Sequence, residues 1–135
     1  MLLLSAISCR NKGADTETHD TYVVVVSFDG FRWDYADLYE TPNFDDLATH
    51  GIKAERMIPS FPTKTFPNHY SLATGLYPDN HGIINNSFYA PELDGIYRIG
   101  DNDMVTNPDA YFGEPLWVTA EKQGIKSASY FWVGS

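Results

Sequence analysis

The hydrophobic residues of the chain fall into short apolar runs separated by amphipathic segments. Residues 22–28 (Tyr-Val-Val-Val-Val-Ser-Phe) are a β-branched run that is apolar on both faces, which is typical of a central strand of a parallel sheet covered on both sides. Residues 52–57 and 125–133 are further apolar runs and predict two more strands. The segments between these runs carry the signals of helices.

Three segments are predicted to be helical. In the first, Thr41 suits the N-cap position and Pro42 the first helical position, and Phe44 and Leu47 fall on one face. A glycine follows each segment directly, and glycine is favoured just after a helix because it adopts a left-handed backbone without strain. The predicted helices span residues 42–50, 68–74 and 115–123.

The order of these elements is β-α-β-loop-α-loop-α-β, which predicts an α/β fold with a mainly parallel sheet sandwiched by helices. Turn signals, including Asp94-Gly95, punctuate residues 76–103, which are predicted to be irregular. A doubly wound sheet rarely ends directly after an apolar strand. We therefore expect this chain to be the N-terminal part of a larger protein, with a fold that is incomplete at the C-terminus.

Composition narrows the class of protein. The chain has 135 residues, which suits one domain at most, and its single cysteine, Cys9, excludes an internal disulfide. With 9 basic and 18 acidic residues, the net charge is -9, which argues against a specific nucleic-acid surface. If such an acidic chain handles phosphates, we expect bound metal to supply the positive charge; the alternative is a simple solvated acidic surface.

Residues 1–20 resemble an export signal. The apolar segment 1–8 is too short to span a bilayer, which takes about 20 residues, and it resembles the end of a signal-peptide core. Ala6-Ile7-Ser8-Cys9 loosely resembles a bacterial lipobox, although leucine is preferred where Ala6 stands. We predict a signal-peptide remnant with a lipoprotein-like tether, attached to a membrane through a lipidated Cys9 on an exported, periplasmic or cell-surface protein. The alternative is an incidental cysteine.

The first candidate site residue is Asp29, which comes directly after the valine run. In open α/β sheets, ligands bind beyond the carboxyl ends of the strands. A carboxylate there, beside Gly30, suits a metal ligand. Asp-Gly is also a common turn pair, and position alone leaves both interpretations open.

The segment Pro62-Thr63-Lys64-Thr65-Phe66-Pro67-Asn68-His69 holds the next candidates. Thr65 falls just before a helix whose first turn can start near Phe66, so its hydroxyl faces free N–H groups and the positive end of the helix dipole. Such a hydroxyl suits a nucleophile if a metal activates it. The alternative is an N-cap threonine without chemistry. The ring of Phe66 is either an exposed stacking surface for a base or a core residue.

His69, His81 and two asparagines complete the set of candidates. Neither histidine has a second ligand at a useful helical spacing, so we interpret both as hydrogen-bonded structural residues rather than metal ligands. Asn85 and Asn86 together indicate a turn. One of them could instead donate an amide hydrogen bond to a developing oxyanion.

Several motifs together resemble the nucleotide pyrophosphatase/phosphodiesterase family of the alkaline phosphatase superfamily. The resemblance runs from about residue 23 to the end of the chain, and Thr-Lys-Thr-Phe-Pro-Asn-His is its most specific block. The motifs are Val-Ser-Phe-Asp-Gly-Phe-Arg (26–32), Thr-Pro-Asn (41–43), Phe-Pro-Thr-Lys-Thr-Phe-Pro-Asn-His-Tyr (61–70), Thr-Gly-Leu-Tyr-Pro (74–78), His-Gly-Ile-Ile (81–84) and Tyr-Phe-Trp-Val-Gly-Ser (130–135).

This resemblance implies an alkaline-phosphatase-like fold and assigns residues 21–135 to the N-terminal part of a catalytic domain. It implies hydrolysis of nucleotide phosphodiester or pyrophosphate bonds through a covalent intermediate on Thr65, with two zinc ions as cofactors. Asp29 and Thr65 match zinc-binding residues, and Thr65 also matches the nucleophile. Asn86, together with the main-chain N–H of Phe66, matches the phosphate-oxygen binder, and the Phe66 ring matches an aromatic residue that stacks on the nucleobase.

The chain departs from the family pattern at peripheral positions, where Asn85 replaces a common aspartate and Val133 a common proline. The residues Ala90-Pro91 also differ from the usual pair. The other zinc ligands that the family uses cannot be placed in this sequence, so we expect the chain alone to be inactive. The alternatives are a relative acting on phospholipid or phosphomonoester substrates, and a non-catalytic truncated module.

Overall fold

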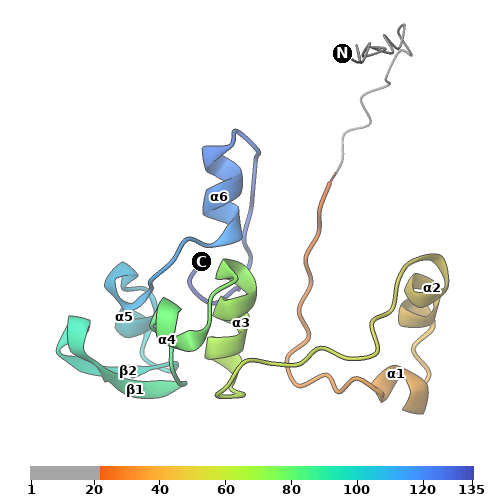
Figure 1. Ribbon diagram of the computed structural model, residues 1–135, viewed down its shortest axis with the longest axis horizontal. Helices are drawn as coiled ribbons and strands as arrows, with labels where there is room; N and C mark the ends of the chain where they lie inside the picture. Colours follow the sequence, from red (N-terminus) through yellow and green to blue (C-terminus); the bar gives the residue numbers. More distant parts are fainter. Residues whose placement is uncertain (1–21) are drawn as a thin grey trace, which may run out of the picture.

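The computed structural model describes residues 22–135. The predicted signal segment and lipidated Cys9 therefore lie outside the described residues. Among those that are described, no helix has the length and apolar character needed to cross a membrane. Figure 1 shows helix α3 (Thr65–Thr74) near the middle of the chain's path, with the C-terminal end close to it.

Short helices dominate the described part of the chain. A helix at 42–50 was predicted and is confirmed, although the Thr41 side chain makes no capping hydrogen bond. Helix α3 begins at Thr65, three residues before the predicted 68–74, and ends at Gly75, whose φ of 70° is left-handed as expected. The other helices are α1 (Tyr35–Leu38), α2 (Pro42–His50), α4 (Pro78–His81), α5 (Asn102–Val105) and α6 (Leu116–Lys122), with 3-10 turns η1 (Pro91–Leu93) and η2 (Pro108–Ala110).

An antiparallel hairpin interrupts the segment predicted to be irregular. Strand β1 (Ser87–Ala90) pairs with β2 (Gly95–Arg98), with Phe88 opposite Tyr97. The expectation for residues 76–103 was therefore wrong at this hairpin. The turn signal at Asp94-Gly95 marks the end of the connection, where Asp94 has φ 45°. The apolar residues of the two short strands alternate over too few positions to stand out in the sequence.

The three predicted strands do not pair with one another within residues 22–135. The sheet formed by the described residues is the two-stranded hairpin, and residues 22–28, 52–57 and 125–133 contribute no strand to it. Most of their apolar side chains are accordingly exposed, with Val24 at 82%, Ile52 at 101% and Tyr130 at 93%, whereas Val133 packs into the core. A mainly parallel sheet is thus absent here, because β-branched runs need neighbouring strands and covering helices before they form a ladder.

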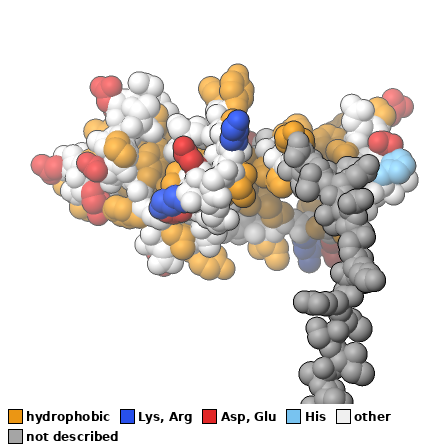
Figure 2. All heavy atoms as spheres, turned by 90° about the horizontal axis from the view of Figure 1, so that it is seen from above, with side chains coloured by type: hydrophobic (Ala, Val, Ile, Leu, Met, Phe, Trp, Pro, Cys, Tyr) orange, Lys and Arg blue, Asp and Glu red, His pale blue; other side chains and the backbone are white. Residues whose placement is uncertain are grey.

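The core lies between α3, the hairpin and the C-terminal residues. Tyr70 from α3 packs edge-on against Tyr111, with ring centroids 5.1 Å apart. Tyr97 of β2 is fully buried and stacks on Phe88. Figure 2 shows many hydrophobic side chains at the surface between the two ends of the molecule. The buried set is Tyr70, Ala73, Ile83, Ala90, Tyr97, Ala110 and Val133.

Candidate active site

The structure brings Asp29 and Thr65 together across 36 residues of sequence. The Thr65 hydroxyl donates a hydrogen bond to Oδ2 of Asp29, with 3.1 Å between the oxygens. Asp29 sits in the turn after residues 22–28, next to Gly30, whose φ of 69° suits glycine. The position of Asp29 was compatible with a ligand or a turn residue, and in the structure it is a turn residue whose carboxylate reaches the threonine.

Thr65 is the first residue of α3, and the N-cap position belongs to Lys64. The Lys64 side chain makes no capping hydrogen bond, and of the two alternatives for Thr65 the one that placed it at the N-cap is wrong. Its hydroxyl instead lies at the positive end of the helix, which favours anions. The fold thus brings a hydroxyl, a carboxylate and a helix N-terminus together in one place.

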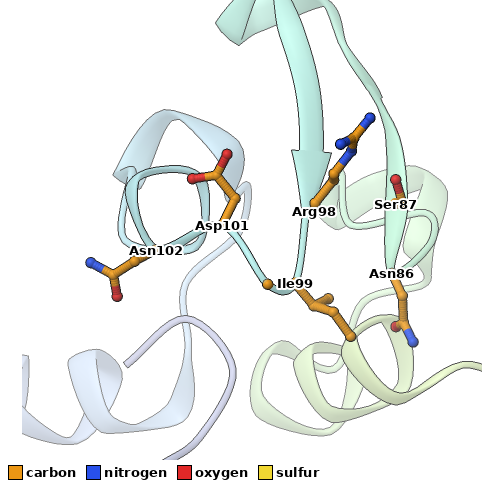
Figure 3. A pocket seen from close by; sticks show the side chains of 7 residues that line it. Asn86, Ser87, Arg98, Ile99, Asp101 and Asn102 are labelled. Atoms are coloured by element: carbon orange, nitrogen blue, oxygen red, sulfur yellow. The ribbon is translucent and has the colours of Figure 1, made fainter.

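Asn86 reaches the same helix start from the hairpin. Its Oδ1 accepts a hydrogen bond from the main-chain N–H of Phe66 at 3.1 Å. Its own main-chain N–H donates to Oδ1 of Asn85, and its carbonyl accepts from the N–H of Ile99. Among residues 22–135, the Nδ2 group of Asn86 makes no protein hydrogen bond, which leaves two N–H donors at the site. Figure 3 shows Asn86 and Ile99 pointing to one side of the hairpin and Arg98 to the other.

The Phe66 ring is half-buried and packs against the core. It meets Tyr97 in an edge-on arrangement with centroids 6.4 Å apart. Of the two alternatives for this ring, the structure shows packing against the core, while part of the side chain stays exposed. Its main-chain N–H, expected to help bind phosphate oxygen, is engaged by Asn86 in this structure.

A hydrogen-bonded chain behind the site includes the fully buried His81. The Ile83 N–H donates to Nδ1 of His81, so the proton of the neutral ring lies on Nε2 and points to Oγ of Ser71, 2.9 Å away. Ser71 in turn contacts Oγ of Ser60 at 3.3 Å. His81 is therefore a hydrogen-bonded structural residue, in line with the sequence-based interpretation.

The series of hydrogen bonds continues through Asn68 to the loop that precedes the candidate nucleophile. Oδ1 of Asn68 accepts from both the N–H and the hydroxyl of Ser60, and its Nδ2 donates to the carbonyls of Pro62 and Lys64. These bonds hold residues 60–64 against α3. Sequence reasoning missed Ser60 and Ser71, because no local signal marks a serine whose partners are distant in sequence.

We predict that the free energy of unfolding falls as pH falls below about 6.5, because the buried His81 is harder to protonate in the native state than in the unfolded chain. Desolvation lowers the pKa of His81 below its ordinary value of 6.5, with the nearby Asp79 opposing this shift. The unfolded chain therefore takes up this proton first, and the native state loses stability between pH 6.5 and the lower native pKa, by at most about 1.4 kcal/mol per pH unit. Denaturant unfolding between pH 7 and pH 5 measures this decline.

Two substitutions of histidine by glutamine test this prediction, one at His81 and a matched control at His50. The His81→Gln variant should lose this part of the pH dependence, whereas His50→Gln, at an exposed position, should keep it. Equal pH dependence in both variants would show that His81 is not responsible.

Asp29 and Thr65 supply two oxygen ligands of the kind that divalent metals accept. Within residues 22–135, no group of three or more His, Cys, Asp or Glu side chains could hold a metal ion. A catalytic zinc ion normally takes three protein ligands. The two oxygens therefore fit part of a zinc site, and completing it requires ligands that the described residues do not provide.

A cavity of about 940 Å³ opens beside these residues, at the upper end of the range for small-molecule sites. Asp29, Thr65 and Asn86 contribute to its wall together with aromatic side chains such as Phe28 and Phe31. A shallower hollow of about 680 Å³ lies on the hairpin and shares Asn86 with this cavity (Figure 3).

At this helix N-terminus, the Thr65 hydroxyl bonds to a carboxylate, and the Nδ2 group of Asn86 lies nearby with its N–H donors unpaired among the described residues. These groups define a site suited to phosphate chemistry. The family described as Type I phosphodiesterase / nucleotide pyrophosphatase matches residues 23–135. The chain belongs to this family. The α/β fold class of this family agrees with the helices and the small sheet of the structure.

Individual relatives extend the comparison. The chain is 44% identical over 115 residues to ectonucleotide pyrophosphatase/phosphodiesterase family member 3 of Bos taurus, covering 84% of the chain and 13% of the relative. It is 45% identical over 114 residues to family member 1 of Homo sapiens, covering 83% of the chain and 12% of the relative. It is 38% identical over 136 residues to family member 7 of Rattus norvegicus, covering 94% of the chain and 29% of the relative. The chain thus spans a minor part of the length of these relatives.

Proposed function

We propose that the full-length protein hydrolyses nucleotide phosphodiester or pyrophosphate bonds through a covalent intermediate on Thr65. The contact between the Thr65 hydroxyl and Asp29 carries the proposal, because it joins a nucleophile to a carboxylate at a helix start. The names of the relatives supply the substrate class. Residues 21–135 belong to the catalytic domain in this proposal, and the apolar segments 22–28, 52–57 and 125–133 pair into a mainly parallel, alkaline-phosphatase-like sheet.

In the first step, Oγ1 of Thr65 forms a bond to phosphorus as the bond to the leaving alcohol or nucleotide breaks; the hydroxyl proton is released to solvent, and a leaving alkoxide takes up a proton from solvent. Asp29 Oδ2, which accepts the hydroxyl hydrogen bond, orients the attacking oxygen. In the second step, water attacks the phosphorus of the covalent intermediate and releases Thr65 as a hydroxyl. Both steps proceed more easily in line, with attacking and leaving oxygens on opposite sides of phosphorus.

In this proposal, a bound metal supplies the positive charge that a phosphate substrate requires. The carboxylate of Asp29 would repel a phosphate next to Thr65, and the chain as a whole has a net charge of -9. A divalent ion held by Asp29 and Thr65, with further ligands, would lower the pKa of the hydroxyl and offset the phosphate charge. Two zinc ions are the proposed cofactors.

Asn86 is the proposed donor to a nonbridging phosphate oxygen, because its Nδ2 group has no protein partner among the described residues. We predict that Asn86→Ala lowers turnover by about 10²–10³-fold, the usual cost of losing one oxyanion donor. Turnover of a nitrophenyl ester of thymidine monophosphate by the full-length protein measures this effect. The exposed Asn80 in α4 offers the matched control, and equal losses in Asn80→Ala and Asn86→Ala would contradict the role.

A comparison of three chromogenic substrates tests the substrate class. The proposal expects the nitrophenyl ester of thymidine monophosphate to be hydrolysed faster than nitrophenyl phosphate or nitrophenyl phosphorylcholine. Preference for nitrophenyl phosphorylcholine would instead favour a phospholipid substrate, for which the aromatic wall of the cavity offers apolar contact. Preference for nitrophenyl phosphate would indicate a monoesterase, and hydrolysis of none would overturn the proposal.

Export is proposed on the names of the relatives, which are ectonucleotide enzymes. Membrane attachment through a lipidated Cys9 and a periplasmic or cell-surface location remain predictions, because they rest on residues 1–20. Mass spectrometry of the protein purified from its own host would detect or exclude an acyl chain on Cys9.

A further inference from the structure

Two hydrogen bonds, rather than one, join the segment after the valine run to helix α3. Besides the bond between Asp29 and Thr65, Oγ of Ser27 lies 3.0 Å from Nε2 of His69. The second bond involves neither candidate ligand directly. It links the residue two positions before Asp29 to the residue four positions after Thr65.

The spacing of these four residues explains why both bonds form together. Ser27 and Asp29 are two residues apart, and both side chains face α3, because each makes a hydrogen bond to it. Residues four apart in a helix lie one above the other, so Thr65 and His69 share one face of α3. Two residues of extended chain advance about 6.6 Å and four residues of helix about 6 Å. The two steps match closely enough to align both pairs.

The surroundings of His69 fix the direction of its hydrogen bonds. Nδ1 of His69 lies 2.8 Å from the carbonyl oxygen of Thr65. A carbonyl only accepts, so Nδ1 carries the proton, and Nε2 of the neutral ring accepts from the hydroxyl of Ser27. The Trp132 ring lies edge-on to the imidazole at 5.7 Å, and its N–H donates to the His69 carbonyl. The ring is thus held by the helix on one side and by the C-terminal segment on another.

We propose that Ser27 and His69 are a positioning pair that holds Asp29 in register with the Thr65 hydroxyl; this inference rests on the proposed function. Asp29 lies in an exposed turn, and its carboxylate makes no other side-chain hydrogen bond among residues 22–135. Without the pair, only the Asp29–Thr65 bond would set the position of the carboxylate. The imidazole bonded to the Thr65 carbonyl ties that position to the backbone of the nucleophile itself.

The test compares Ser27→Ala, His69→Ala and the double variant with the unaltered full-length protein. We expect each single change to lower kcat by about 10–100-fold, the usual cost of losing a residue that orients a ligand. KM should change little, because the pair contacts no substrate. The double variant should be no worse than the poorer single variant, since both changes break the same bond. Ser87→Ala, at an exposed position on β1, is the matched control.

Two conservative substitutions at His69 separate positioning from a structural role. His69→Gln places an acceptor near the position of Nε2 and should recover part of kcat by accepting from Ser27. His69→Asn places a donor near Nδ1 and keeps the bond to Thr65 but loses the one to Ser27, so kcat should stay low. If Asn restores kcat better than Gln, the pair with Ser27 is not what matters, and the inference is overturned.

A further readout does not depend on activity. Nitrogen-15 NMR of histidine-labelled protein should show His69 protonated on Nδ1, with Ser27→Ala shifting its Nε2 resonance. If the unaltered protein is active and Ser27→Ala, with an unchanged circular dichroism spectrum, has the same kcat, the positioning pair alone is overturned. No hydrolysis by the unaltered protein would instead overturn the proposed function. Should Ser27→Ala fail to fold, Ser27→Thr retains the hydroxyl and must then keep full kcat.

Discussion

Replacing Thr65 by alanine is expected to lower turnover by at least about 10⁴-fold, as loss of a covalent nucleophile does in other hydrolases. The proposed reaction has no other hydroxyl in contact with Asp29 among the described residues. The free energy of unfolding should change by no more than about 1 kcal/mol, because the lost hydrogen bond is exposed and the core does not depend on it. Steady-state kinetics and denaturant unfolding of the full-length protein measure the two quantities.

Two further variants make this result specific. Thr65→Ser keeps the hydroxyl and should retain part of the turnover. Thr49→Ala removes an exposed helical threonine that, in α2, bonds only to the carbonyl of Asp45, so turnover should not change. Near-normal turnover in Thr65→Ala would contradict the assignment of the nucleophile and would favour the non-catalytic alternative.

Replacing Asp29 by asparagine is expected to reduce both metal content and turnover by more than about 10²-fold. Residues that only orient a metal ligand cost about 10–100-fold when lost, and a direct ligand should cost more. Asparagine keeps the size of the side chain and removes its charge, so the turn at Asp29-Gly30 should persist. Metal content after dialysis, measured by plasma mass spectrometry, gives a readout that does not require activity.

Asp103→Asn provides the control for the change of charge, since Asp103 is exposed on α5 and does not line the cavity beside Asp29. It should leave metal content and turnover unaltered. If Asp29→Asn retains the metal and loses turnover, Asp29 orients Thr65 without binding metal. If it retains both, the proposed site is wrong.

The described structure also explains why the site depends on distant parts of the chain. Helix α3 is buried on the side of Tyr70, which packs against Tyr111 and His81. Desolvation raises the pKa of Tyr70 accordingly. At the start of α3, Asn86, which directly precedes β1 of the hairpin, accepts a hydrogen bond from the Phe66 N–H. Helix α3 is therefore held by contacts with His81, Tyr111 and Asn86, which all lie more than ten residues from Thr65 in sequence.

Local signals in the sequence predicted α2, α6 and the end of α3, but not the short helices α1, α4 and α5. The proline after Thr41 and the glycine after Thr74 mark the start of α2 and the end of α3, because capping and left-handed turns depend on residues within one turn of the helix. The family resemblance assigned Asp29, Thr65 and Asn86 to one site, and the structure brings these residues to one helix start. Their chemical roles remain predictions.

Only the tertiary structure decided which groups meet. The hairpin at Ser87–Arg98 and the lack of pairing in residues 22–28 depend on partners elsewhere in space, which an apolar run does not specify. The same holds for the two histidines: His69 carries its proton on Nδ1 and His81 on Nε2, because different carbonyl and N–H groups face them. Residue types and local spacing thus determined helix ends and candidate side chains, whereas contacts across the fold determined strand pairing, hydrogen-bond partners and the protonated nitrogen of each histidine.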